Sequence, residues 1–150
     1  MVQVLSPVAG RRQEVSDVPD PVFARGLVGP GAAIAPHPGP QSAVAPIDGR
    51  LVKLHPHAFV IVSERGPGVL VHLGIDTVQL HGDGFTPLVP EHAVVRAGDE
   101  IVSWDPEYVE HTGRSAMCAV VVLDCPFPAL ALSGSGDEVR SAEPLFAIEC

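Results

Sequence analysis

Short apolar or alternating runs recur along the chain, and each is closed by Gly, Pro or Asp. Runs of this kind, bounded by turn residues, are typical of β-strands, and many short strands in succession are typical of a sandwich or barrel. The expected strands are Val44–Ala45, Gly49–Leu54, Ala58–Ser63, Gly68–Leu73, Glu100–Trp104, Ala119–Leu123 and Leu145–Glu149. The pattern therefore predicts an all-β protein.

Helical structure is expected only in residues 105–116, which read DPEYVEHTGRSA. Asp105 can cap a helix, and Pro106 suits its first position. The 15 Gly and 16 Pro residues leave little room for long helices. We expect at most one or two short helical turns.

Several short segments repeat one another. Ser6–Arg11 (SPVAGR) is echoed by Ala45–Arg50 (APIDGR), and in both a glycine follows the proline and turns the chain toward the next strand. A second spacing occurs in the sets Val28, Gly31, Ile34; Val95, Gly98, Ile101; and Val139, Ala142, Leu145. The repeats predict a pseudo-symmetric β-sandwich or flattened barrel built on a reused strand–turn–strand unit.

Length, composition and charge narrow the class of protein. A chain of 150 residues suits one compact domain, so we expect residues 1–150 to form a single domain. Hydrophobic residues make up 46% of the chain and charged residues 18%, which is unlike a disordered protein. The net charge of -9 argues against binding to nucleic acid or to an anionic membrane surface, because both require clustered Lys and Arg.

The apolar runs also bear on localisation. The N-terminal segment MVQVLSPVAGRRQEV lacks the basic region and apolar run of a secretory signal. The longest apolar run, Ala116–Leu123, has the length of a buried strand and falls short of the ~20 residues of a membrane span. We expect a soluble, cytoplasmic protein without membrane insertion.

The three cysteines, Cys118, Cys125 and Cys150, are odd in number and lack Cys-x-x-Cys spacing. This pattern argues against a disulfide framework and against a thiolate zinc site. We expect all three to be reduced, with Cys118 buried in a strand.

Four of the seven histidines are expected at the surface. His37 and His92 lie in loops, His111 lies in the expected helical segment, and His81 opens a glycine-rich turn. The remaining candidates for a functional site are His55, His57 and His72.

His72 lies within the apolar strand VLVHLGID. Strict alternation places it on the same face as Leu70, Gly74 and Asp76. Gly74 has no side chain, so we expect a gap beside the imidazole where a bulky group can approach.

His57 is expected beside His72. If Ser63–Gly68 closes a hairpin, positions whose numbers sum to about 131 pair, so that His72 faces Phe59 and His57 lies one same-face step further along. Two imidazoles then meet on an apolar face. A neutral imidazole offers a lone pair as nucleophile, proton acceptor or metal ligand, and two hydrogen-bonded core histidines are the purely structural alternative.

The segment around His72, VHLGIDTVQLHGDGF, resembles the signature around the phosphorylated histidine of the glucose-family IIA proteins of the bacterial phosphoenolpyruvate-dependent sugar phosphotransferase system. Further segments that resemble the family, in the same order, are SPVAG, DVPDPVFARGLVGPGAAIAP, VAPIDGRLVKL, HAFVIVSERG, VRAGDEIVSWD and LSGSG. The resemblance covers nearly the whole chain. It implies an antiparallel β-sandwich whose active face surrounds the two histidines.

The resemblance also implies roles for individual residues. His72 corresponds to the residue that accepts a phosphoryl group on Nε2 from the phosphocarrier HPr and passes it to a sugar-specific EIIB domain of a membrane permease. His57 matches the companion histidine, which hydrogen-bonds the phosphate and is needed for onward transfer. Gly74, Asp76 and Leu70 belong to the docking rim. The resemblance thus implies a phosphotransferase that forms a phosphohistidine intermediate and requires no cofactor for the transfer.

Two features depart from the family pattern. His55 stands two residues before His57, where threonine is common, which leaves open what hydrogen-bonds the companion histidine. Leu70 and Leu73 occupy positions that are often phenylalanine, so the docking surface is expected to be aliphatic.

Two other functions would use the same residues. A zinc-dependent hydrolase would take His57, His72 and an aspartate as metal ligands, although no catalytic base is apparent. The resemblance also implies a regulatory module that binds transport or metabolic proteins, with a zinc ion shared between chains through His57 and His72, and the expected apolar rim suits such binding. The second is compatible with a phosphocarrier. The sequence does not identify the sugar.

Overall fold

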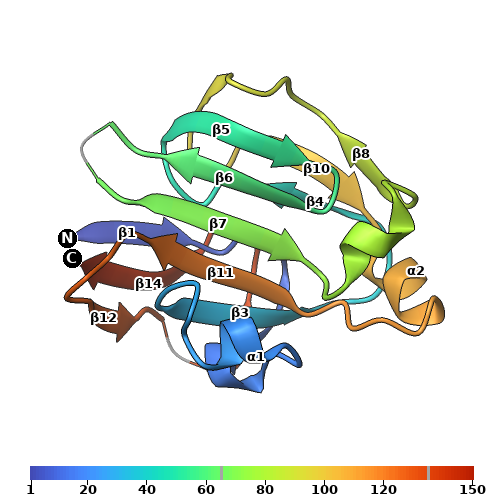
Figure 1. The fold of residues 1–150 in the computed structure, drawn as a ribbon, viewed down its shortest axis with the longest axis horizontal. Helices are drawn as coiled ribbons and strands as arrows, with labels where there is room; N and C mark the ends of the chain where they lie inside the picture. Colours follow the sequence, from blue (N-terminus) through green and yellow to red (C-terminus); the bar gives the residue numbers. More distant parts are fainter. Residues whose placement is uncertain (65, 135) are drawn as a thin grey trace.

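The computed structural model describes residues 1–64, 66–134 and 136–150. An eight-stranded sheet, in the order β13-β2-β3-β11-β7-β6-β5-β9, packs against two three-stranded sheets, β1-β14-β12 and β4-β10-β8 (Figure 1). All strand pairings in these ranges are antiparallel. The predicted antiparallel β-sandwich is confirmed.

The strands cover more of the chain than the apolar runs suggested. Their bounds are β1 Val2–Leu5, β2 Gly10–Glu14, β3 Gly31–Pro36, β4 Gln41–Val44, β5 Gly49–His55, β6 Ala58–Val62, β7 Gly68–Leu73, β8 Phe85–Pro87, β9 Val94–Val95, β10 Glu100–Trp104, β11 Cys118–Leu123, β12 Ala129–Leu132, β13 Glu138–Val139 and β14 Pro144–Glu149.

Helices are short. The expected helix is α2, Pro106–His111, and the Asp105 side chain accepts a hydrogen bond from the amide of Glu107 as a cap. A second helix, α1, Pro21–Ala24, was not predicted. Two 3-10 turns, η1 Val15–Asp17 and η2 Thr77–Leu80, complete the helical structure of the described residues. Within these residues, no helix has the length and apolar character needed to cross a membrane.

Strand β7 shows how the core positions the site. Val69, Val71 and Leu73 are fully buried between the sheets, whereas Leu70 and His72 lie on the outer face and are half-buried. Complete burial of each apolar side chain contributes about 1.5–3 kcal/mol. The alternation predicted for this strand is confirmed, and the core holds His72 outward.

The internal repeat is confirmed for two of its three copies. The amide of Ala142 donates to the carbonyl of Ser6, and that of Gly98 donates to Ala45, both at 2.8 Å. Gly98 and Ala142 share a positive φ, of 96° and 68°, at the turns that lead into β10 and β14. The third copy was wrong, because Gly31 begins β3 and has no positive φ. Two similar turns into a strand therefore remain.

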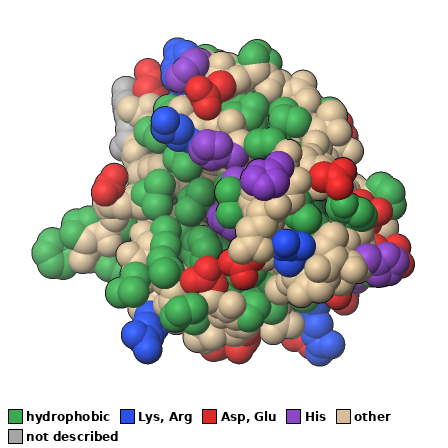
Figure 2. Space-filling view, turned by 45° about the vertical axis from the view of Figure 1, so that its right-hand side comes forward, with side chains coloured by type: hydrophobic (Ala, Val, Ile, Leu, Met, Phe, Trp, Pro, Cys, Tyr) green, Lys and Arg blue, Asp and Glu red, His purple; other side chains and the backbone are tan. Residues whose placement is uncertain are grey.

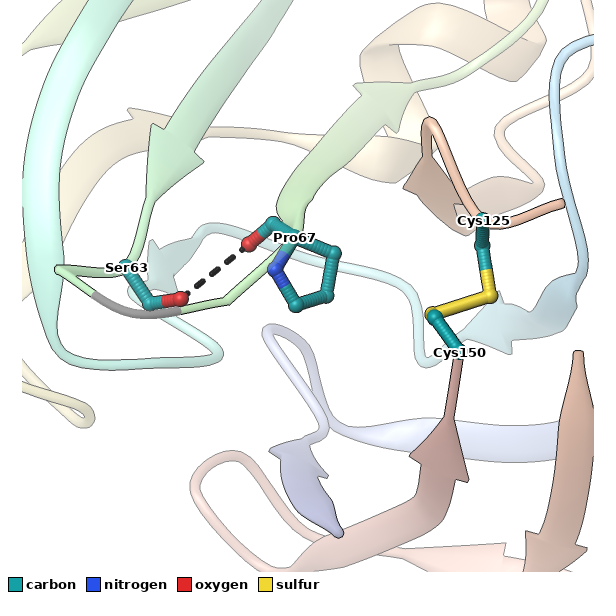
Figure 3. The surroundings of a disulfide bond; sticks show 4 residues. All are labelled: Ser63, Pro67, Cys125 and Cys150. Carbon is teal, nitrogen blue, oxygen red and sulfur yellow. Dashed lines mark hydrogen bonds between the residues drawn. A yellow bond between two sulfur atoms is a disulfide. The ribbon is translucent and has the colours of Figure 1, made fainter.

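The expectation that all cysteines are reduced was wrong for two of them. Cys125 and Cys150 form a disulfide with Cα atoms 5.0 Å apart (Figure 3), whereas Cys118 is a buried free thiol as expected. The bond joins the turn after β11 to the residue that follows β14. Nearby, the Ser63 hydroxyl donates to the carbonyl of Pro67 in the β6–β7 loop (Figure 3). Spacing along the chain gave no sign that the two cysteines lie side by side.

The predicted register of the β6–β7 hairpin was wrong by one residue. Val62 pairs with Gly68 and Ala58 pairs with His72, so the position numbers sum to 130. The loop is therefore one residue shorter at its end than expected, and it contains Arg65, which lies outside the described residues. A slip of one residue moves a side chain to the opposite face. Phe59 is accordingly buried in the core rather than beside His72.

Candidate functional site

His72 lies near the end of β7 with one ring nitrogen already bonded. Its Nδ1 lies 2.5 Å from the carbonyl oxygen of Gly74. Because a carbonyl only accepts, Nδ1 carries the proton and donates. In the neutral ring, the lone pair then belongs to Nε2. A hydrogen bond within two residues of the strand end thus fixes the tautomer.

His57 lies beside His72, as the sequence predicted, but it belongs to a turn. Strand β5 ends at His55 and β6 begins at Ala58, so Pro56 and His57 form the two-residue connection. The carbonyl of His57 accepts a hydrogen bond of 2.8 Å from the amide of Leu73 at the end of β7. The two imidazole centroids are 5.3 Å apart and meet edge to face at 72°.

Gly74 has a different structural role from the one predicted. The strand ends at Leu73, and Gly74 has a φ of +78°, so it turns the chain instead of forming a gap on the strand face. A Cβ atom there would lie 2.6 Å from Cγ2 of Thr77 and 3.0 Å from the carbonyl oxygen of Ser115. Glycine is required here by both backbone conformation and space. The turn it allows brings its carbonyl to His72.

Phe23 completes the surroundings of His72 and was not predicted. Its ring centroid lies 5.3 Å from that of His72, and its side chain packs in an apolar cluster with Ala33, Ala119 and Val121. Helix α1, which carries Phe23, lies over the large sheet (Figure 1). The sequence held a signal for this helix, because Asp20 and Pro21 repeat the capping pattern of Asp105 and Pro106. Nothing in the sequence placed the helix beside β7.

The other expected site residues lie around the pair. Leu70 is on the outer face of β7 with His72, and it packs against a second apolar cluster, to which Phe23 belongs. Asp76 is exposed, with a φ of +60°, at the start of η2. His55 is exposed and its ring stacks on His57, with centroids 5.7 Å apart and planes inclined by 27°. Histidine side chains gather beside an apolar stretch of surface (Figure 2).

The four other histidines are exposed, as expected. They are His37, His81, His92 and His111. Nε2 of His37 lies 2.8 Å from Oε2 of Glu138. Nε2 of His92 lies 3.3 Å from Oε1 of Glu91.

Electrostatics keep both central imidazoles neutral at pH 7. The pKa of His57 is lowered to about 4, mainly by burial and to a smaller extent by the neighbouring His72 and His55. Burial also lowers the pKa of His72, whereas the hydrogen bond to Gly74 and the carboxylates of Asp20 and Asp76 oppose this shift. A neutral imidazole retains the lone pair that a nucleophile or ligand needs.

The site is poorly suited to a zinc ion held by this chain alone. Over residues 1–64, 66–134 and 136–150, no group of three or more His, Cys, Asp or Glu side chains is placed to hold a metal. A catalytic zinc site normally takes three protein ligands. His57 and His72 supply two, so further ligands would have to come from another molecule.

The chain as a whole is similar in sequence and in fold to known proteins. Residues 2–125 match the family model for the phosphoenolpyruvate-dependent sugar phosphotransferase system, EIIA 1. The chain belongs to this family. It is a phosphotransferase family, and its members include a glucose-specific EIIA component of Bacillus cereus that is 36% identical over 121 residues, covering 79% of this chain and 72% of that protein.

Two further relatives bear on this EIIA chain. The glucose-specific EIIBCA component of Corynebacterium glutamicum is 40% identical over 124 residues, which cover 81% of this chain and 18% of that longer protein. The solved glucose permease IIA from Mycoplasma capricolum superimposes with a TM-score of 0.85 at 31% identity, covering 97% of this chain and 94% of the other. This chain therefore spans about a fifth of one curated relative and most of another.

Proposed function

We propose that this EIIA protein is a phosphocarrier in which Nε2 of His72 accepts a phosphoryl group from phospho-HPr and passes it to an EIIB domain. The observation that carries the proposal is the hydrogen bond from Nδ1 of His72 to the Gly74 carbonyl. A second neutral imidazole, that of His57, lies beside it, with the two ring centroids 5.3 Å apart. The bond leaves Nε2 as the nucleophilic atom.

Acceptance requires one bond to form and one to break. The Nε2 lone pair attacks phosphorus, the phosphorus–nitrogen bond of the donor breaks, and its electron pair returns to the donor histidine. The proton on Nδ1 stays hydrogen-bonded to Gly74, which stabilises the positive character that the ring gains. Donation to EIIB reverses these steps with a different acceptor. Such a transfer depends mainly on positioning and charge stabilisation.

His57 is the companion that donates a hydrogen bond to the phosphoryl oxygens. Its ring lies edge-on to His72, and its neutral state leaves one N–H donor. A phosphoryl group brings negative charge, which favours a proton on His57 through an opposite charge nearby. His57 thus binds the group more strongly as charge develops, which is what catalysis requires.

The partners follow from the same proposal. HPr is the donor, and the EIIB domain of a membrane sugar permease is the acceptor, in keeping with the naming of the Corynebacterium relative as an EIIBCA component. Both docking events use the surface around Leu70, Phe23 and Asp76, and both occur in the cytoplasm. Transport and metabolic proteins that bind the unphosphorylated form, with a zinc ion shared through His57 and His72, are further proposed partners. The proposal includes no zinc-dependent hydrolysis.

The decisive experiment is phosphorylation with purified components. Incubation with phosphoenolpyruvate, enzyme I and HPr should add one phosphoryl group that is acid-labile and base-stable, and tandem mass spectrometry should locate it on His72. Addition of an EIIB domain should remove it. A group found on any histidine other than His72, or no group at all, would reject the proposal.

A further inference from the structure

The His57 ring has two other imidazoles as neighbours. Within the described residues, no hydrogen bond holds either of its ring nitrogens, and its aromatic neighbours are His72, at 5.3 Å between ring centroids, and His55, at 5.7 Å. The final torsion of a histidine side chain is broad and roughly two-fold. A neighbouring ring that stacks on His57 can therefore select among the orientations of its imidazole.

We infer that His55 is a positioning residue for His57: its ring stacks on His57 and holds that ring in the orientation needed for phosphoryl transfer at His72. The inference rests on the proposed function. It assigns to stacking the task that the family resemblance left open at this position, where threonine is common.

The backbone keeps the two rings together. His55 pairs with Ala58, so Pro56 and His57 form a closed two-residue turn, and proline fixes one of its torsions. One side of the turn is anchored where the Leu54 amide donates to the Glu91 carboxylate at 2.9 Å. The other is anchored by the bond between the His57 carbonyl and Leu73. The backbone that carries both rings is therefore held on either side of the turn.

Stacking of this kind changes the populations of the ring orientations of His57 by a modest factor. Favourable aromatic pairs change the population of one arrangement by about twofold to tenfold. Since transfer requires the donor on His57 to point at the phosphoryl oxygens, the rate of transfer falls with the fraction of correctly oriented rings. The binding of the partner protein does not depend on that fraction.

His55 is exposed, so a direct contact with EIIB is the alternative role. The two roles predict different kinetics. A positioning residue alters kcat with KM unchanged, because its effect is realised in the transition state, whereas a docking residue alters KM. A substitution that restores a flat ring without the imidazole nitrogens separates them further.

The test compares His55→Ala, His55→Phe and a matched control, His111→Ala, in donation from the phosphorylated protein to the EIIB domain of a glucose-specific permease. His111 is also exposed, and no ring contact or hydrogen bond of its side chain occurs in the described part of the chain. We expect His55→Ala to lower kcat about fivefold with KM unchanged, His55→Phe to recover to within about twofold, and His111→Ala to match the wild type.

Long-range proton–nitrogen NMR of the unphosphorylated protein gives a readout that is independent of transfer. Ring signals of His57 should shift in His55→Ala and return toward their original positions in His55→Phe. The same spectra report whether each variant is folded. A rise in KM at constant kcat, a His55→Phe variant as slow as His55→Ala, or a His55→Ala variant equal to the wild type would overturn the inference. Failure of the wild type to be phosphorylated would instead reject the proposed function, and the NMR comparison would still decide the stacking.

Discussion

Nδ1 of His72 lies 2.5 Å from the carbonyl oxygen of Gly74, only two residues away along the chain. Two residues so close in sequence can form this bond because Gly74 turns the backbone immediately after the strand, with a φ of +78°. One turn therefore accomplishes two things. It ends β7, and it binds one nitrogen of the imidazole so that the other is left to react.

His72→Gln is expected to abolish phosphorylation while the protein stays folded. Glutamine has no nucleophilic nitrogen lone pair, and the half-buried position of His72 tolerates a polar side chain. Radiolabelled phosphoenolpyruvate with enzyme I and HPr would measure acceptance, and circular dichroism would measure folding. Normal labelling of the variant would show that the acceptor is another residue.

His57→Gln is expected to accept a phosphoryl group but to donate it at least a hundredfold more slowly, because general acid–base or donor groups at reacting sites contribute about 10²–10⁴-fold. Single-turnover transfer from the charged variant to an EIIB domain would measure this step. Donation at the wild-type rate would contradict the division of roles between the two histidines.

Folding stability should depend on pH between about 4 and 6.5 because of His57. Its pKa is about 4 in the folded protein, mainly through burial, against an ordinary value of 6.5. In this window the unfolded chain binds a proton that the folded chain does not. The free energy of unfolding therefore rises with pH, and it falls when the solution is acidified. His72 has a lowered pKa and the same sign.

We expect His57→Gln to reduce, without abolishing, this slope in urea unfolding measured from pH 4 to 7. The remaining slope belongs to His72 and other groups. An unchanged slope would show that His57 is readily protonated in the folded protein.

Gly74→Ala is expected to destabilise the protein by about 2–4 kcal/mol, because a Cβ atom would add a clash with Thr77 and Ser115 to the backbone strain of a positive φ. Gly113→Ala is a matched control, since Gly113 has a φ of +85° but nothing lies within 4 Å of an added Cβ. The control should lose only about 1 kcal/mol. Urea unfolding would compare them, and equal losses would mean that the clash at Gly74 is relieved.

The disulfide is expected to contribute about 3 kcal/mol, since a bond spanning 25 residues removes that much loop entropy from the unfolded chain. A reducing agent should lower the melting temperature by roughly 6–12 °C. The double variant Cys125→Ser, Cys150→Ser should melt at this lower temperature with or without reductant. Three reactive thiols in the denatured, unreduced wild type would show that the bond is absent.

The sequence by itself determined the fold class and the placement of His72 on a strand. Strands with apolar alternation, such as β7, were predicted with their bounds because burial of one face leaves a period of two. Strands β2 and β3 were missed because GRRQE is polar and GAAIAP is rich in alanine, so neither carries that pattern. The resemblance to the IIA family rested on motifs spread over the chain, and the family model and the relatives confirmed it.

Only the tertiary structure decided which side chains meet. A one-residue difference in loop length moved Phe59 to the core, and the residues that surround His72 come from α1, the β5–β6 turn and the segment after β7. The disulfide likewise joins segments that are distant in sequence. Local patterns report burial and backbone preference, whereas the contacts of Phe23 and His55 depend on how strands far apart in the chain pack together.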